Sequence, residues 1–149
     1  MGCSSPLFNL QLNRCHGRWL GFMANKRLRI MILERNHLQR LYIEKMLNEL
    51  GYYRIAMMRS TTEVFSVLRH AIEAFDLVIA NRTLVTDALP DFTPVCKGHP
   101  QVRHVLIYDC SASVFSTELS GAEGGSYTSL PHPPDSHSIR NLMEQVERS

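Results

Sequence analysis

The chain has 149 residues, of which 44% are hydrophobic and 20% are charged. This is the balance of an ordinary globular domain and excludes an intrinsically disordered chain. The formal net charge of +2 is too small to argue for a nucleic acid or a membrane surface as a partner. No apolar run approaches the roughly 20 residues that a membrane-spanning helix needs. The cysteines form no C-x-x-C pair, so we expect free thiols in a reducing cytoplasm.

Residues 1–26 differ in composition from the rest of the chain. Their charged residues are all basic, and their apolar stretches are short and interrupted by polar residues. A signal peptide needs an apolar run of roughly 7–15 residues and a cleavage site, and neither is clear here. We predict a poorly ordered extension over 1–26, or a misassigned start with translation beginning at Met23. Residues 27–149 then form one domain, which leaves no room for an output domain and predicts a module that stands alone.

From Leu28 onward, short apolar runs alternate with amphipathic segments. The run over 28–33 is typical of a buried strand. The segment 37–50 repeats apolar residues at the helical i, i+3, i+4, i+7 spacing, and Gly51 marks its carboxyl end. Residues 54–58 form another apolar run, so the sequence opens with a strand, a helix and a strand.

The middle of the chain continues the alternation. Residues 60–63 have the capping-box form S-x-x-E, which predicts a helix that carries its apolar residues as far as Ile72. Residues 77–80 predict a third buried strand. The segment 91–98 is expected to be weakly helical at best, because Pro94 interrupts it.

The last third of the chain contains the remaining predicted elements. Residues 105–108 predict a fourth strand, 111–119 a short helix, 121–125 a flexible glycine-rich break and 127–130 a fifth strand. The final helix has its apolar residues on one face, at Ile139, Leu142, Met143 and Val146.

Short apolar strands that alternate with helices predict an α/β fold. The expected architecture is a doubly wound, five-stranded parallel sheet in a three-layer α/β/α sandwich. In such folds the functional groups lie beyond the carboxyl ends of the strands. The residues at these ends are Glu34, Arg35, Asn81, Asp109 and the turn 130–133.

The segments LRIMILERNHLQRLYIEKMLNELGY, FDLVIANRTL and GGSYTSLPHP carry the clearest family signal. They resemble, in order, the opening strand and helix, the phosphorylated strand and the G-A-x-x-Y-x-x-K-P ending of bacterial two-component response regulator receiver domains. The resemblance extends from about Arg27 to Ser149 and implies the flavodoxin-like (CheY-like) form of the predicted fold.

Receivers take a phosphoryl group onto one aspartate, and the resemblance indicates that this chain has lost that chemistry. An acidic pair of the family binds Mg²⁺, and here Glu34-Arg35 occupies that position. Asn81 occupies the phosphoacceptor position. Asp109 occupies the position of the Thr or Ser that contacts the phosphoryl oxygens, or Cys110 or Ser111 does if the alignment slips.

The ending of the motif can be aligned in two registers. In the preferred one, Tyr127 matches the family's aromatic residue, Leu130 its phosphoryl-binding lysine and Pro131 its proline. A slip of two residues would place His132-Pro133 on the Lys-Pro instead. By resemblance, the peptide bond before the matched proline is expected to be cis.

These replacements have direct chemical consequences. The amide of Asn81 cannot form an acyl phosphate, and Arg35 places a fixed positive charge where a cation would bind, so we expect no Mg²⁺ and no cofactor. Arg35 is available to pair with Glu34 or Asp109. Leu130 offers no charge to a phosphoryl oxygen. Cys110 is interpreted as a buried structural thiol.

The sequence therefore predicts an atypical, cytoplasmic receiver domain that signals by protein–protein contact without phosphorylation. The resemblance implies a binding face made of the fourth helix, the fifth strand and the fifth helix. The partner would be a histidine kinase, another response regulator or an effector, and a homodimer remains open. The alternative is a pseudo-receiver that binds a small ligand among Glu34, Arg35, Asn81 and Asp109. An enzyme is disfavoured, because no glycine-rich phosphate loop follows the first strand and no nucleophile is paired with a base, so no catalytic residue is assigned.

Overall fold

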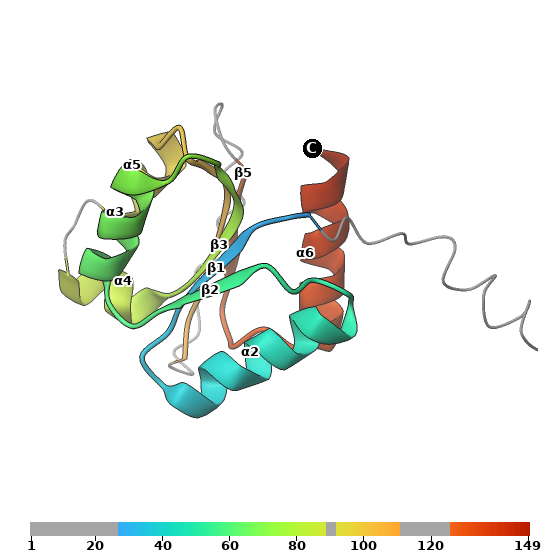
Figure 1. The fold of residues 1–149 in the computed structure, drawn as a ribbon. Helices are drawn as coiled ribbons and strands as arrows, with labels where there is room; N and C mark the ends of the chain where they lie inside the picture. The colour runs from blue at the N-terminus through green and yellow to red at the C-terminus, as the bar shows by residue number, and fades with distance from the viewer. Residues whose placement is uncertain (1–26, 89–91, 111–125) are drawn as a thin grey trace, which may run out of the picture.

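The computed structural model describes residues 27–88, 92–110 and 126–149, drawn in colour in Figure 1. The predicted extension 1–26, helix 111–119 and break 121–125 lie outside these residues. The elements in chain order are β1 (Ile30–Leu33), α2 (His37–Glu49), β2 (Ile55–Met58), α3 (Thr61–His70), β3 (Phe75–Asn81), α4 (Arg82–Ala88), α5 (Phe92–Gly98), β4 (Val102–Tyr108), β5 (Ser126–Leu130) and α6 (Ser136–Arg148).

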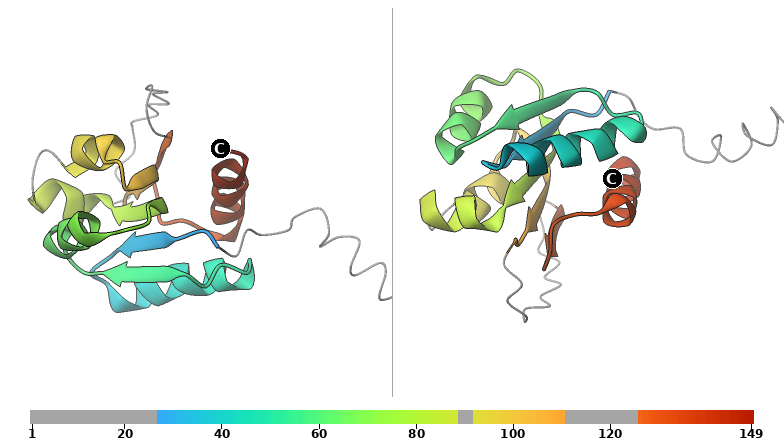
Figure 2. Two further views of the ribbon diagram at one scale, coloured as in Figure 1. Left: turned by 45° about the horizontal axis from the view of Figure 1, so that its top comes forward. Right: turned by 90° about the horizontal axis from the view of Figure 1, so that it is seen from below.

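The strands form one five-stranded sheet in the order β2-β1-β3-β4-β5, and every neighbouring pair is parallel. Helices α2 and α6 cover one face, while α3, α4 and α5 cover the other (Figures 1 and 2). The predicted three-layer α/β/α sandwich is therefore confirmed. Because all strands run in the same direction, their carboxyl ends meet at one edge of the sheet.

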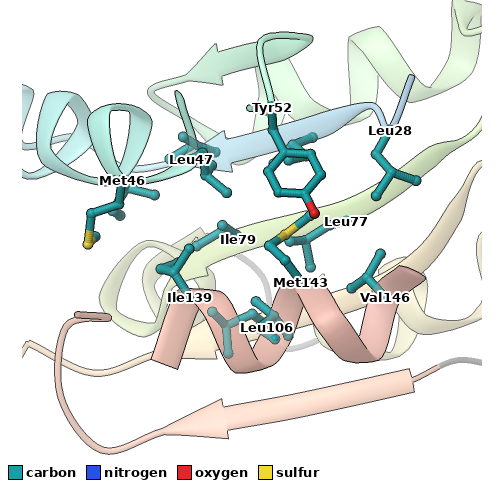
Figure 3. Packing of buried hydrophobic residues seen from close by; sticks show 14 of the residues in the cluster. Leu28, Met46, Leu47, Tyr52, Leu77, Ile79, Leu106, Ile139, Met143 and Val146 are labelled. Atoms are coloured by element: carbon teal, nitrogen blue, oxygen red, sulfur yellow. The ribbon is translucent and has the colours of Figure 1, made fainter. Parts of the chain in front are cut away.

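The core consists of two apolar clusters, one on each face of the sheet. Along β1, Ile30 and Ile32 face α2 and α6, and Met31 and Leu33 face the other helices. Figure 3 shows the first cluster, in which Met143 of α6 packs among residues of α2 and β3. Burial on both faces explains why the strands read as continuous apolar runs rather than as alternating ones.

The short helices after β3 differ from the prediction. The segment 91–98 contains a regular helix, α5, and the expectation of weak helicity was wrong. Pro94 is the third residue of α5, where the backbone N–H has no acceptor within the helix and its loss costs little. Helix α4 was not predicted, because β-branched residues such as Val85 favour helices only weakly.

Capping residues turn the chain sharply where it leaves the carboxyl ends of β1 and β2. The side chain of Asn36 accepts hydrogen bonds from the first turn of α2. Ser60 caps α3 as the capping-box pattern predicted, with its hydroxyl 3.3 Å from the Glu63 backbone nitrogen. These short connections keep the residues after each strand at the sheet edge. None of the helices described here is both long and apolar enough to span a membrane.

Candidate functional site

The carboxyl ends of β1, β3 and β4 bring Glu34, Asn81 and Tyr108 together in a buried polar network. Glu34 is 2% exposed, Asn81 8% and Tyr108 0%. Asn81 Nδ2 donates to Glu34 Oε2 at 2.8 Å, and the Tyr108 hydroxyl donates to the same oxygen. The other oxygen, Oε1, accepts the backbone N–H of Asn36 at 2.7 Å. The Glu34 carboxylate is therefore surrounded by donors from the chain itself.

The remaining groups of this network are also satisfied. Asn81 Oδ1 accepts the Thr83 backbone N–H at 2.9 Å, which fixes the orientation of the amide. Burial raises the pKa of Tyr108, and the hydrogen bond to Glu34 and its charge raise it further, so the hydroxyl stays a donor. A satisfied buried network of this kind is rigid, and it leaves no unpaired group for a ligand.

Arg82, the residue after Asn81, links the ends of three strands. Its Nε lies 3.5 Å from Asp109 Oδ2, beyond β4, and its Nη2 donates to Ser129 Oγ of β5 at 2.7 Å. The backbone N–H of Asp109 also donates to Leu130 O at 3.0 Å. The guanidinium thus connects the end of β3 to β4 and β5.

The predicted pairing of Arg35 is wrong. Arg35 is exposed, and among the described residues it forms no ion pair with Glu34 or Asp109. Glu34 turns its side chain into the sheet edge, so the next residue of the extended chain points away from it. Arg82 is the residue that pairs with Asp109.

Sequence reasoning missed Arg82, Tyr108 and Arg40 as members of the site. Arg40 donates from Nη1 to the backbone oxygen of Glu34 at 2.8 Å. Position at the carboxyl end of a predicted strand could have indicated two of them, because Arg82 follows one such strand and Tyr108 is the last residue of another. Arg40 carried no signal, because it lies on the face of α2 that the helical pattern assigns to the core.

Cys110 is exposed, so its interpretation as a buried thiol was wrong. It follows the end of β4, where the chain leaves the sheet, and its Sγ lies 3.4 Å from Asn81 Nδ2. Partial desolvation raises the pKa of the Cys110 thiol, and the charges of Glu34 and Asp109 raise it further. The residue is therefore a protonated thiol rather than a reactive thiolate.

The residues aligned with the last family motif lie on and just after β5. Tyr127 is half-buried, and the Lys97 ammonium lies 3.6 Å from the centre of its ring. Leu130 ends β5, and its side chain packs against the apolar cluster that α2 and α6 cover. Pro131 and His132 are both exposed.

The expected cis peptide bond before the matched proline is absent. All peptide bonds of the described residues are trans, including the one before Pro131. The trans form of an X-Pro bond is favoured by about 0.5–1 kcal/mol unless tertiary contacts reverse the preference.

The residues at this edge do not fit the Mg²⁺ that typical receivers bind. A magnesium ion needs carboxylate oxygens that are free to coordinate it. The Glu34 carboxylate already accepts hydrogen bonds from Asn81, Tyr108 and a backbone N–H, and Asp109 is paired with Arg82. In the described part of the chain, no group of three or more His, Cys, Asp or Glu side chains is placed to hold a metal.

Comparisons with known structures identify the fold. No family model and no curated protein matches the sequence. The crystal structure of a response regulator receiver domain protein from Bacillus halodurans C-125 matches with a TM-score of 0.59 and 20% identity, covering 82% of this chain and 98% of that one. A CheY-like receiver domain from Methylobacillus flagellatus matches with a TM-score of 0.55 and 16% identity, covering 80% and 98%. The chain therefore has the CheY-like receiver fold.

Proposed function

We propose that this domain is a receiver-like module of two-component signal transduction that acts through protein–protein contacts and without phosphorylation. The observation that carries the proposal is the Arg82 bridge. In receivers, by the resemblance described above, a phosphoryl group at the end of the third strand is contacted from the ends of the fourth and fifth strands. Here the guanidinium of Arg82 makes both connections itself, to Asp109 and to Ser129. An internal contact that needs no phosphoryl group thus stands where the family has a phosphorylation-dependent one.

The bridge also reaches the surface that the resemblance assigns to partners. Ser129 lies on β5, which together with α6 forms the described part of that surface. The family's fourth helix corresponds to the segment 111–125, outside the described residues. The proposed partner is a histidine kinase, another response regulator or an effector in the cytoplasm, and the domain needs no Mg²⁺ and no catalytic residue of its own.

A small ligand among Glu34, Arg35, Asn81 and Asp109 is not supported by the geometry. The side-chain groups of Glu34 and Asn81 hydrogen-bond within the chain, and Asp109 is paired with Arg82. A ligand would have to break these contacts to bind there.

Incubation with acetyl phosphate and Mg²⁺ should leave the protein unmodified. The amide of Asn81 is no nucleophile, and the neighbouring carboxylates are not free to hold the metal. Intact mass spectrometry checks this, with a receiver that retains its aspartate treated in parallel. A stoichiometric, Mg²⁺-dependent gain of one phosphoryl group would overturn the proposal.

Arg82→Met should loosen the connection between β4 and β5 while leaving the global stability nearly unchanged. The Arg82 side chain is 42% exposed and that of Asp109 23%, so the ion pair contributes well below about 1 kcal/mol to stability. Hydrogen exchange at the Asp109 amide, which donates to Leu130 O, should accelerate by about threefold as that edge opens more often. The matched control is Arg140→Met on the exposed surface of α6. Equal protection of Asp109 in both variants would contradict the bridging role.

A further inference from the structure

Three adjacent strands are each followed by an arginine at the carboxyl edge of the sheet. Arg59 follows β2, Arg35 lies just beyond β1, and Arg82 follows β3. The strands are in register, with Leu33 opposite both Met58 and Ala80. Because neighbouring strands lie about 4.8 Å apart, the three arginines begin close together on one rim.

Arg40 adds a buried guanidinium beside this rim. It is 5% exposed, donates to the backbone oxygen of Glu34 at 2.8 Å, and its Nη2 lies 3.1 Å from His37 Nδ1. The first contact is to a neutral backbone carbonyl, and the second is to an imidazole, so neither partner is an anion. A buried arginine is ordinarily paired with a carboxylate or another anion, because the desolvated charge is costly alone.

Among the described residues, Arg35, Arg40 and Arg59 form no ion pair with a carboxylate. Glu34 is committed to the buried network, and Asp109 is paired with Arg82. Glu63 borders the rim, but its Oε2 accepts the backbone N–H of Arg59 at 2.8 Å. The guanidinium groups of Arg35, Arg40 and Arg59 therefore outnumber the two neighbouring carboxylates, those of Glu34 and Glu63.

Two hydrogen bonds bring the starting points of Arg35, Arg40 and Arg59 close together. The backbone N–H of Glu34 donates to Met58 O at 3.1 Å, which places the residue after Met58 beside the one after Glu34. Arg40 reaches the same segment through the Glu34 oxygen. The rim formed by Arg35, Arg40 and Arg59 therefore surrounds one backbone junction between β1 and β2.

We propose that the rim formed by Arg35, Arg40 and Arg59 binds, reversibly and without a metal, the phosphate group of a small anion. The ligand is either inorganic phosphate or a phosphomonoester, since the planar guanidinium fork matches the oxygens of both. The site lies between β1 and β2, and Arg82 is not part of it because its guanidinium contacts Asp109 and Ser129. It does not depend on the proposed signalling function, because no covalent bond forms at Asn81.

The test is an NMR titration of the ¹⁵N-labelled protein in buffer with a chelator and no Mg²⁺. Inorganic phosphate forms one arm and glycerol phosphate the other, each at an ionic strength held constant with chloride. We expect saturable shifts at the amides of Arg35, Arg40 and Arg59. Tighter binding of glycerol phosphate would identify an esterified ligand, and equal binding would identify the phosphate group itself.

Exposed arginines supply the variants. Arg35→Gln and Arg59→Gln should each weaken binding by about tenfold, equivalent to about 1.4 kcal/mol, and fold normally because both side chains are exposed. Arg69→Gln, at the far end of α3, is the control and should bind as the wild type does.

Chemical shifts that do not saturate with either ligand would contradict the proposed site. Arg35→Gln and Arg59→Gln variants that bind as tightly as the wild type would contradict it as well. Neither result bears on the acetyl phosphate experiment, which reports covalent modification and needs Mg²⁺. The two proposals can therefore fail separately.

Discussion

Replacing Asn81 by aspartate should destabilise the domain by about 3 kcal/mol at neutral pH, although the two side chains have almost the same shape. The substitution removes the Nδ2 donor that lies 2.8 Å from Glu34 Oε2 and puts a carboxylate oxygen in its place. Two carboxylates would then face each other at positions that are 2% and 8% exposed. Urea denaturation of the variant and of the wild type measures the difference.

The pH dependence gives this prediction a definite sign. Mutual repulsion raises the folded-state pKa of one carboxyl above its unfolded value, so the penalty is largest above the raised pKa. It should shrink as the pH falls toward the unfolded pKa of about 4. Asn141→Asp on the exposed surface of α6 adds the same charge and should show neither effect. A deficit that stays constant with pH would show that repulsion from Glu34 is not its cause.

The same variant should also fail to accept a phosphoryl group from acetyl phosphate. A carboxylate at position 81 restores the nucleophile, but Asp109 remains paired with Arg82 and Leu130 still supplies no cation. The explanation differs from the one that the sequence suggested, which relied on Arg35 excluding the metal. Arg35 is exposed, and Arg82 is the cation that pairs with Asp109.

Tyr108→Phe should destabilise the domain by about 2 kcal/mol, because it removes a hydrogen bond to a buried charge and leaves the packing volume nearly unchanged. The hydroxyl donates to Glu34 from a side chain that is fully buried. Without it, the carboxylate keeps only its contacts to Asn81 and the Asn36 backbone. Chemical denaturation at neutral pH gives the magnitude.

A double-mutant cycle separates this charge-assisted bond from simple loss of contact. In a Glu34→Gln background the acceptor is neutral, so the further change Tyr108→Phe should cost less than about 1 kcal/mol. Tyr52→Phe is the matched control, because its hydroxyl donates to Glu147 at 2.6 Å, and Tyr52 lies before the start of β2 whereas Tyr108 ends β4. Its cost should be the same with either residue at position 34. Additive effects of Tyr108→Phe and Glu34→Gln would show that the two groups are not coupled.

The fold could be predicted from the sequence because strands that are buried on both faces of the sheet appear as continuous apolar runs. All residues of β3 are buried, and the apolar run around 77–80 shows this directly. The alternation of such runs with amphipathic segments limits the topology to a parallel sheet with crossover helices. The alternation also fixed which residues lie at the carboxyl edge, including Glu34 and Asn81.

The pairings at that edge could not be predicted in the same way. A strand pattern locates the backbone of a residue, but it does not determine which of several neighbours a long arginine side chain contacts. Arg35 and Arg82 both follow strand ends, and only the three-dimensional register shows that Arg82 meets Asp109 and Ser129. The exposure of Cys110 was missed for a related reason, since the general tendency of free cysteines to be buried says nothing about a residue that leaves the sheet.

The closure of the core by the last helix has a consequence for biosynthesis. Leu28, near the start of the fold, and Val146, near the end of α6, belong to the same apolar cluster. A protein is made from its N-terminus, so the face of β1 and α2 stays uncovered until residues 139–146 have left the ribosome. Ribosome-bound chains that already contain β1 to β4 therefore display an apolar surface that only the last helix covers.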